Sequence, residues 1–365
     1  MKKKLGLKTT GEVLRPEDIT WERISDGLRT KQITSSAVIG FSVGISSCQA
    51  IVDCDAVYDR SICHWLKKGS YGEHLARELM AEDAENAADQ LLPIFKRTSG
   101  VDGWVMLPTS PLLPSETTAM VEAVRALYRE VRRPNVLISI PGLQDWLPAL
   151  EKLFTLGIPL NAGLIFSVDQ FQAVALAYRN ACEARLAGGS TSSSACFTTI
   201  PVDRLIAGLS HFLPDESAVE ASIAITAEIA QAAQKLRFSE PWQRFSEAGG
   251  QPPRLVWTLE ENRSMSRLEI PADGRQANRL SLGGMTGNNK ASDFFGKTST
   301  DGYQKKNTSF YEFEPTGIHF TAIADRLQND EAENSIRAWI RLLDSLARKS
   351  AALATGDCTQ HKGED

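Results

Sequence analysis

The sequence predicts an α/β protein, a (β/α)8 barrel of eight parallel strands surrounded by helices. Short apolar runs alternate with amphipathic segments along the 365 residues. About seven or eight of these runs have the length and the turn-forming flanks of buried strands. None is followed by the Gly-x-Gly-x-x-Gly turn of a dinucleotide-binding sheet. Length alone permits one large barrel or two ordinary domains, and the regular alternation favours the barrel.

The clearest strand–helix–strand unit spans Asn135–Ser167. The apolar runs Val136–Ile140 and Asn161–Phe166 predict its strands, because prolines and polar residues bound them. Apolar residues between them recur every three or four positions, which predicts a helix with one buried face: Leu143, Leu147, Leu150, Leu153 and Phe154. In a barrel built from such units, ligands bind at the carboxyl ends of the strands.

The chain before this unit begins with a polar segment, residues 1–19, that we expect to be irregular. The apolar run Ala37–Ile45 predicts a buried strand. The segment Tyr71–Arg97 predicts a helix, because its apolar residues fall on one side of a charged surface. A strand at Gly103–Leu107 and a helix at Glu116–Arg132, the latter with Ser115 as its N-cap, complete this part.

The chain after the central unit continues the alternation. Residues 260–306 are rich in Gly, Asn, Ser, Thr and Lys, and we expect a long connection there. We expect one barrel over residues 20–353 and a disordered tail over 354–365. The expected elements are Asp169–Ala187 (helix), Ser194–Thr199 (strand), Val202–Leu213 and Glu216–Arg237 (helices), Arg254–Thr258 and Gly317–Ala322 (strands), and Glu331–Leu353 (helix).

Composition excludes several classes of function. The chain has 40 basic and 45 acidic residues, a formal charge of −5, so no nucleic-acid surface is expected. No apolar run has the length of a signal peptide or a membrane span, which predicts a cytoplasmic protein without membrane contact. The six cysteines lack metal-ligand spacing and are expected to be reduced. We expect neither a metal ion nor a cofactor.

Two stretches of the chain resemble the transaldolases, chiefly the longer bacterial branch. Residues 102–142, DGWVMLPTSP to RPNVLISIPG, are similar to family motifs of the form DG-[FY]-VS-x-EVSP and RPN-x-[ML]-IK-[VI]-P. Residues 156–189, beginning LGIPLNAGLIFS, are similar to GI-x-[VI]-N-[VL]-TLLFS and the helix that follows it. The resemblance extends more weakly over residues 20–350. It implies a class I aldolase type of (β/α)8 barrel in carbohydrate metabolism, the pentose phosphate pathway.

The resemblance also implies a reaction, and the chain departs from it at the decisive position. Transaldolases carry a dihydroxyacetone unit between sugar phosphates on a lysine Schiff base, which serves as the electron sink for C–C cleavage. Ser139 stands where the family has that lysine, and a hydroxyl forms no imine. The acid of the EVSP motif aligns with Pro108. Amine and acid are both missing from their motifs.

Other family positions are retained in part. Asn161 is kept from the family's Asn-x-Thr pair, and Gly163 replaces the threonine. The resemblance places the remaining candidates for catalysis or ligand binding at changed positions: Glu22 for the first acid, Ser47 and Cys48 in the segment after the second strand, Cys196 for the sixth-strand serine, and Arg263 for a basic phosphate contact. Pro201 aligns with the family's phosphate-binding arginine, which is therefore missing at that position.

Three hypotheses follow for the function. The first is a pseudoenzyme that binds a sugar phosphate, a bulkier small molecule or a partner protein. The second is a barrel enzyme with chemistry that needs no lysine, in the same pocket. The third is an active transaldolase with a relocated lysine, and it ranks last because nucleophile, acid and phosphate anchor are lost together.

The candidate residues also have plain structural interpretations. Ser139 is better explained as a small filler of the barrel interior than as a catalytic group. Cys48 and Cys196 are better explained as small buried hydrophobes than as nucleophiles. An amide inside an apolar strand must be hydrogen-bonded, so Asn161 is either a ligand contact or a structural link.

Overall fold

Eight parallel strands close into a barrel in the computed structural model, which describes residues 11–14, 38–54, 56–190, 194–247, 249–259, 277–280 and 320–355. Each strand pairs with the next along the chain, and β8 pairs with β1. The predicted (β/α)8 barrel is therefore confirmed. The strands are β1 (Gly11–Leu14), β2 (Val38–Ser42), β3 (Trp104–Pro108), β4 (Val136–Pro141), β5 (Leu160–Gly163), β6 (Cys196–Pro201), β7 (Arg254–Leu259) and β8 (Ala277–Leu280).

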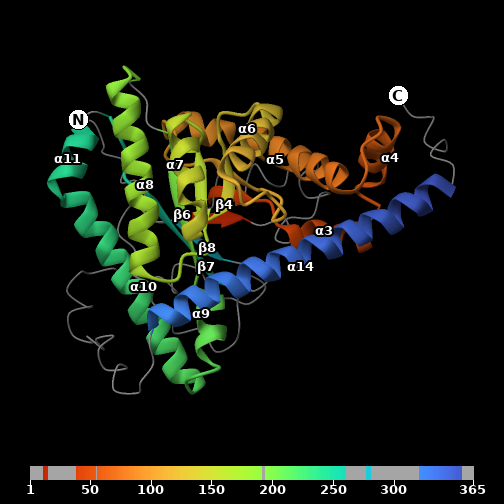
Figure 1. Ribbon diagram of the computed structural model, residues 1–365. Coiled ribbons are helices and arrows are strands. Elements are labelled where there is room, and N and C mark those ends of the chain that lie inside the picture. The colour runs from red at the N-terminus through yellow and green to blue at the C-terminus, as the bar shows by residue number, and fades with distance from the viewer. Residues whose placement is uncertain are drawn as a thin grey trace, which may run out of the picture.

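The helices surround this ring, and the last of them crosses the whole molecule (Figure 1). That helix, α14, lies beside α3, reaches α9 near its start and reaches α4 toward its end. The helices are α3 (Ile45–Cys54), α4 (Asp59–Lys67), α5 (Gly72–Arg97), α6 (Thr117–Val131), the 3-10 turn η2 (Gln144–Trp146), α7 (Leu147–Thr155), α8 (Val168–Ala187), α9 (Val202–Leu209), α10 (Asp215–Phe238), α11 (Glu240–Glu247) and α14 (Phe320–Thr355).

Two strands lie where none was expected. Strand β1 falls inside the polar segment 1–19, and β8 falls inside the expected connection 260–306. Both have four residues and few apolar side chains, so their extended form depends on pairing with neighbouring strands rather than on their own composition. The strand predicted at 317–322 was wrong for residues 320–322, which begin α14. The rest of these segments, and residues 356–365, lie outside the described residues.

The central unit confirms both predicted strands, but β5 is shorter than predicted. It ends at Gly163, because Leu164 adopts a left-handed backbone with φ of 60° and cannot continue a strand. The predicted N-cap of the preceding helix was also wrong. Glu116, not Ser115, caps α6: its carboxylate accepts hydrogen bonds from the backbone N–H groups of Thr118, at 2.9 Å, and Ala119, at 2.7 Å.

The interior of the barrel contains a separate apolar cluster. Its members lie on β3, β4, β6 and β7, which are not all neighbours in the ring, so their side chains pack together across the barrel interior. They are Trp104, Met106, Leu137, Phe197 and Val256. The Trp104 and Phe197 ring centroids are 5.9 Å apart. Side chains alternate along a strand, so residues two positions beyond Leu137 and Phe197 also face inward, one layer nearer the carboxyl ends.

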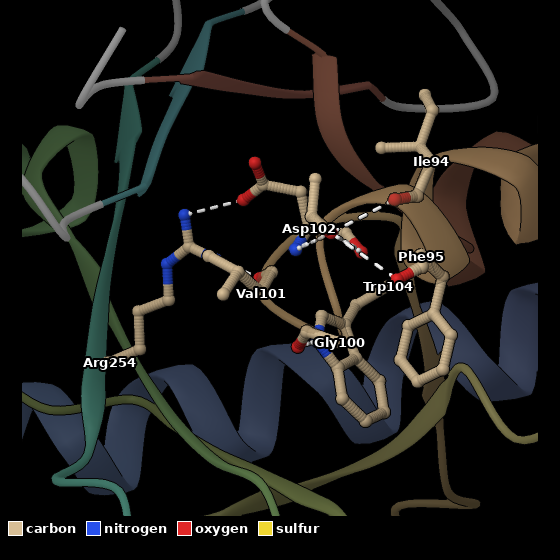
Figure 2. A network of polar contacts seen from close by, with 8 residues as sticks. Ile94, Phe95, Gly100, Val101, Asp102, Trp104 and Arg254 are labelled. Carbon is tan, nitrogen blue, oxygen red and sulfur yellow. Dashed lines mark hydrogen bonds and ion pairs between the residues drawn. The ribbon is translucent and has the colours of Figure 1, made fainter. Parts of the chain in front are cut away.

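A polar network lies at the amino ends of the barrel strands (Figure 2). Arg254, the first residue of β7, forms an ion pair of 2.9 Å with Asp102, which lies just before β3. The Arg254 guanidinium also donates to the carbonyl of Val101 and lies 5.6 Å from the centre of the Phe197 ring. The Trp104 indole N–H donates to the Gly100 carbonyl at 2.9 Å. This network ties β7 to the loop before β3.

Candidate functional site

A chain of side-chain hydrogen bonds crosses three neighbouring strands inside the barrel. The Asn161 side-chain N–H donates to the Ser139 hydroxyl at 3.1 Å, and the Thr199 hydroxyl donates to the Asn161 side-chain oxygen at 2.8 Å. Asn161 is 5% exposed, while Ser139 and Thr199 are half-buried. Ser139 and Thr199 follow Leu137 and Phe197 by two residues, so this polar chain lies above the apolar cluster.

The strand register places Ser139 beside Asn161. Ser139 is paired with Asn161 across β4 and β5, and with Pro108 across β3 and β4. The Ser139 carbonyl accepts from the Thr109 backbone N–H at 3.1 Å. Pro108, Ser139 and Asn161 carry no charge, so this arc of the site can offer hydrogen bonds but no ionised acid or amine. Two sequence-predicted site residues, Ser139 and Asn161, are therefore in direct contact.

Thr199 is a candidate site residue that the sequence pattern did not indicate. The family resemblance places the sixth-strand serine at Cys196 and the arginine, five residues later, at Pro201. Cys196 is instead the first residue of β6 and pairs with Leu160, the first residue of β5, so it lies at the amino end of the strand. At the carboxyl end the same spacing fits Thr199 and Arg204.

Arg204 lies in the first turn of α9, directly after β6, and is held by carboxylates from two helices. Its Nε is 3.5 Å from a carboxylate oxygen of Asp203 and 3.6 Å from one of Glu331 on α14. The Thr258 hydroxyl, near the carboxyl end of β7, donates to the other Asp203 oxygen at 3.2 Å. This cluster adds charge near the carboxyl ends of β6 and β7, whereas Pro108, Ser139 and Asn161 contribute none.

The predicted cysteine candidates do not join this site. Cys196 is 4% exposed, and burial raises the pKa of its thiol well above 9.0. Cys48 lies in α3, where its neighbours are Tyr58 and Asp83 and where burial raises the pKa of its thiol. The Tyr58 hydroxyl donates to the Asp83 carboxylate, so this cluster joins helices outside the strand ring. Both thiols are protonated at neutral pH and are poor nucleophiles.

The other predicted candidates are placed as follows. Ser47 is buried in α3, next to Cys48, and not at the end of a strand. Glu22 and Arg263 lie outside the described residues. Within the described ranges no lysine lies on a strand: these lysines are Lys67, Lys68, Lys96, Lys152, Lys235 and Lys349, all on helices or directly after one.

The described residues contain no grouping of three or more His, Cys, Asp or Glu side chains arranged to hold a metal ion. Among the helices that the structure describes, none combines the length and apolar character needed to cross a membrane.

Comparison with known proteins identifies the family. Residues 24–239 match the family model described as Transaldolase/Fructose-6-phosphate aldolase. The chain is 26% identical over 364 residues to "Transaldolase" of Thermobifida fusca (strain YX), covering 95% of this chain and 98% of that protein. It is 28% identical over 349 residues to "Transaldolase 1" of Streptomyces avermitilis, covering 91% of each. With "Transaldolase 2" of Nostoc punctiforme it shares 28% identity over 270 residues, 69% of this chain and 71% of that protein. The chain belongs to the transaldolase/fructose-6-phosphate aldolase family.

Proposed function

We propose that this chain binds a sugar-phosphate-like ligand at the carboxyl ends of β4, β5 and β6, without the Schiff-base transfer of its family. The observation that carries the proposal is the bond from Asn161 to Ser139. A hydroxyl replaces the family's amine, and the neighbouring amide is retained and hydrogen-bonded to it at 3.1 Å. The site therefore keeps an ordered polar surface while the nucleophile is absent.

The polar chain suits the hydroxyl and carbonyl groups of a sugar. A Ser or Thr hydroxyl both donates and accepts, and an amide offers two donors and an acceptor. Each can exchange its present partner for a ligand atom without leaving a buried charge unpaired. Pro108 at the position of the family's acid supports binding without proton transfer, because a proline side chain moves no proton.

Arg204 is the residue we propose for the phosphate contact. Arginine binds phosphate through paired N–H donors, and Arg204 follows Thr199 by the spacing that the family shows. The Arg204 guanidinium already forms ion pairs with Asp203 and Glu331. The guanidinium and these two carboxylates together carry a net negative charge. We expect this charge to weaken the binding of a dianionic phosphate, and the site to tolerate ligands with less negative charge.

Calorimetry with fructose 6-phosphate, followed by borohydride treatment and mass spectrometry, tests the proposal. We expect saturable binding and no covalent adduct on the wild-type chain. Ligand at about a hundred times its dissociation constant should add roughly 2.7 kcal/mol to the free energy of unfolding. An adduct would instead establish a relocated lysine. If neither fructose 6-phosphate nor an uncharged sugar binds, the proposal fails and a partner protein becomes the next candidate ligand.

A further inference from the structure

The side chain of Gln328, on α14, joins the segments that follow two neighbouring strands. Its Nε2 donates to the carbonyl oxygen of Gly142, at 3.1 Å, and to that of Leu164, at 2.9 Å. Both partners are carbonyl oxygens, which only accept, so the nitrogen of the amide must face them. Gln328 is 6% exposed, and water therefore competes little for these bonds. A single amide nitrogen bridges the ends of β4 and β5.

The backbone that Gln328 holds is closely packed and strained. Leu164 has a φ of 60°, a left-handed conformation that is unfavourable for a residue with a Cβ atom. A Cβ atom on Gly142 would lie 2.7 Å from Cδ1 of Ile165 and 3.3 Å from the Gly163 carbonyl oxygen, so the two segments are closely packed at this point. The Gly142 N–H also donates to the Gly163 carbonyl at 2.8 Å. Such a conformation persists only where surrounding contacts hold it.

These segments lead directly to the polar chain of the site. Gly142 follows Ser139 by three residues, and Leu164 follows Asn161 by three residues. The backbone N–H of Ile165, the residue after Leu164, donates to the Thr199 carbonyl at 3.2 Å. A shift of either segment would therefore move the residues that carry the site.

A second bridge connects the same segment to α14. Gln170, in the first turn of α8, accepts from the backbone N–H of Phe166 at 2.9 Å and donates to Asp325 of α14 at 3.1 Å. Asp325 precedes Gln328 by three residues and lies on the same face of the helix. Two side chains of α14 thus hold the segment between β5 and α8.

We propose that Gln328 is a positioning residue for the ligand site, and that α14 orders Ser139 and Asn161 by holding the segments that follow them. The inference rests on the proposed function for its ligand. Its structural part, the dependence of the two segments on Gln328, can be tested without any ligand.

The first test measures hydrogen exchange of the full ligand-free chain. Gln328→Met keeps the length and packing of the side chain and removes both donors. We expect amides in residues 140–146 and 162–168 to exchange at least ~10-fold faster, with little change elsewhere, because local bonds open without global unfolding. Asn329→Met, at the adjacent exposed position, serves as the control and should leave both peptides unchanged. Unchanged exchange in Gln328→Met would overturn the inference.

The second test measures affinity for fructose 6-phosphate by calorimetry. We expect Gln328→Met to weaken binding roughly 10-fold, from the loss of two buried hydrogen bonds that order the site. Leu164→Gly should reduce that loss when combined with Gln328→Met, because glycine adopts a φ of 60° without strain. A Gln328→Met loss that is equal in both backgrounds would contradict the proposed strain mechanism.

The two tests separate the inference from the proposed function. If the wild-type chain does not bind fructose 6-phosphate, the proposed function fails while the exchange experiment still decides the role of Gln328. If Gln328→Met does not fold, Asp325→Ala removes the second bridge at an exposed position and should give a smaller increase in exchange over 162–168. No increase in that variant would then overturn the inference.

Discussion

The side-chain amide of Asn161 donates a 3.1 Å hydrogen bond to the hydroxyl of Ser139, and the two residues are also register partners in β5 and β4. The family resemblance places the Schiff-base lysine at the position of Ser139. An amine there would lie beside the same amide. On the proposed function, Asn161 would keep its place beside the reacting position, and the side chain at position 139 would be the part that differs.

Ser139→Lys should restore an amine to this position. With fructose 6-phosphate and borohydride we expect a covalent adduct on Lys at position 139, because an amine on an inner strand condenses with a ketose carbonyl. Peptide mass spectrometry would locate the adduct. Ser139→Met, which has no amine, serves as the control. A folded Ser139→Lys variant that binds the sugar phosphate and stays unlabelled would show that the carbonyl does not reach this residue.

Thr199→Val should weaken ligand binding through Asn161. The substitution keeps the shape of the side chain and removes the 2.8 Å bond to the Asn161 oxygen. We expect a loss of about 1 kcal/mol, or roughly 5-fold in affinity for fructose 6-phosphate, measured by calorimetry. Thr198→Val is the matched control, since its side chain points to the opposite side of the same strand. Equal losses in both variants would argue against a site at Thr199.

Glu331→Gln should strengthen the binding of phosphorylated ligands. It removes one of the two carboxylates that hold Arg204, so the cluster loses one negative charge. Ion pairs near the surface contribute about 0.2–1 kcal/mol, so we expect roughly a 1.4- to 5-fold gain in affinity for fructose 6-phosphate and none for unphosphorylated fructose. Glu333→Gln, which pairs with Arg337 on the same helix, is the control. Unchanged affinity in Glu331→Gln would remove Arg204 from the site.

Arg254→Met should lower stability without changing ligand binding. Arg254 and Asp102 have side chains 14% and 20% exposed, and their ion pair joins the start of β7 to the loop before β3 (Figure 2). Loss of charged hydrogen bonds of this kind costs about 1–3 kcal/mol, measurable as a lower midpoint of urea unfolding. Arg244→Met removes a pair on α11 whose side chains are both 75% exposed, and should cost little. A large drop in the ligand affinity of Arg254→Met would contradict this prediction, because it would show that the amino end of the barrel influences the ligand site.

Stability should fall in alkaline solution because of Cys182. Burial raises the pKa of its thiol from 9.0 to about 11, and Cys182 is 1% exposed. Folding thus favours the protonated thiol, so its contribution is complete below pH 9.0 and is lost as the pH rises toward about 11. Urea unfolding between pH 8 and 11 should show a shallower decline for Cys182→Ala than for the wild type. Parallel declines would contradict the shift.

The local spacing of apolar residues was sufficient to predict most of the strands and helices of the barrel. The runs that became β3, β4 and β7 are mainly apolar, and the segments that became α5, α8 and α10 carry apolar residues at helical spacing. Burial of such residues is the main driving force of folding, so their spacing predicts the element. The motif around Ser139 and the one around Asn161 also placed these two residues on adjacent strands.

Other features depended on pairing and on contacts between distant segments. Strand β8 has only four residues, and β7 and β1 pair with it on either side. Cys196 and Thr199 lie on the same strand, and only the strand's bounds and register showed that Cys196 is at its amino end. A side chain's face changes with every residue, so an alignment shifted by three moves a candidate to the wrong face and the wrong end.

Gln328 shows this limit most clearly. It bonds to Gly142, 186 residues earlier in the chain, and nothing in the polar composition around it distinguishes it from a surface residue of an amphipathic helix. The spacing of apolar residues determines which segments become helices and strands, because that choice depends on neighbours a few positions away. The approach of α14 to the ends of β4 and β5 was decided by packing of the whole chain, and it is this approach that brings the Gln328 amide to the backbone that follows each of these strands.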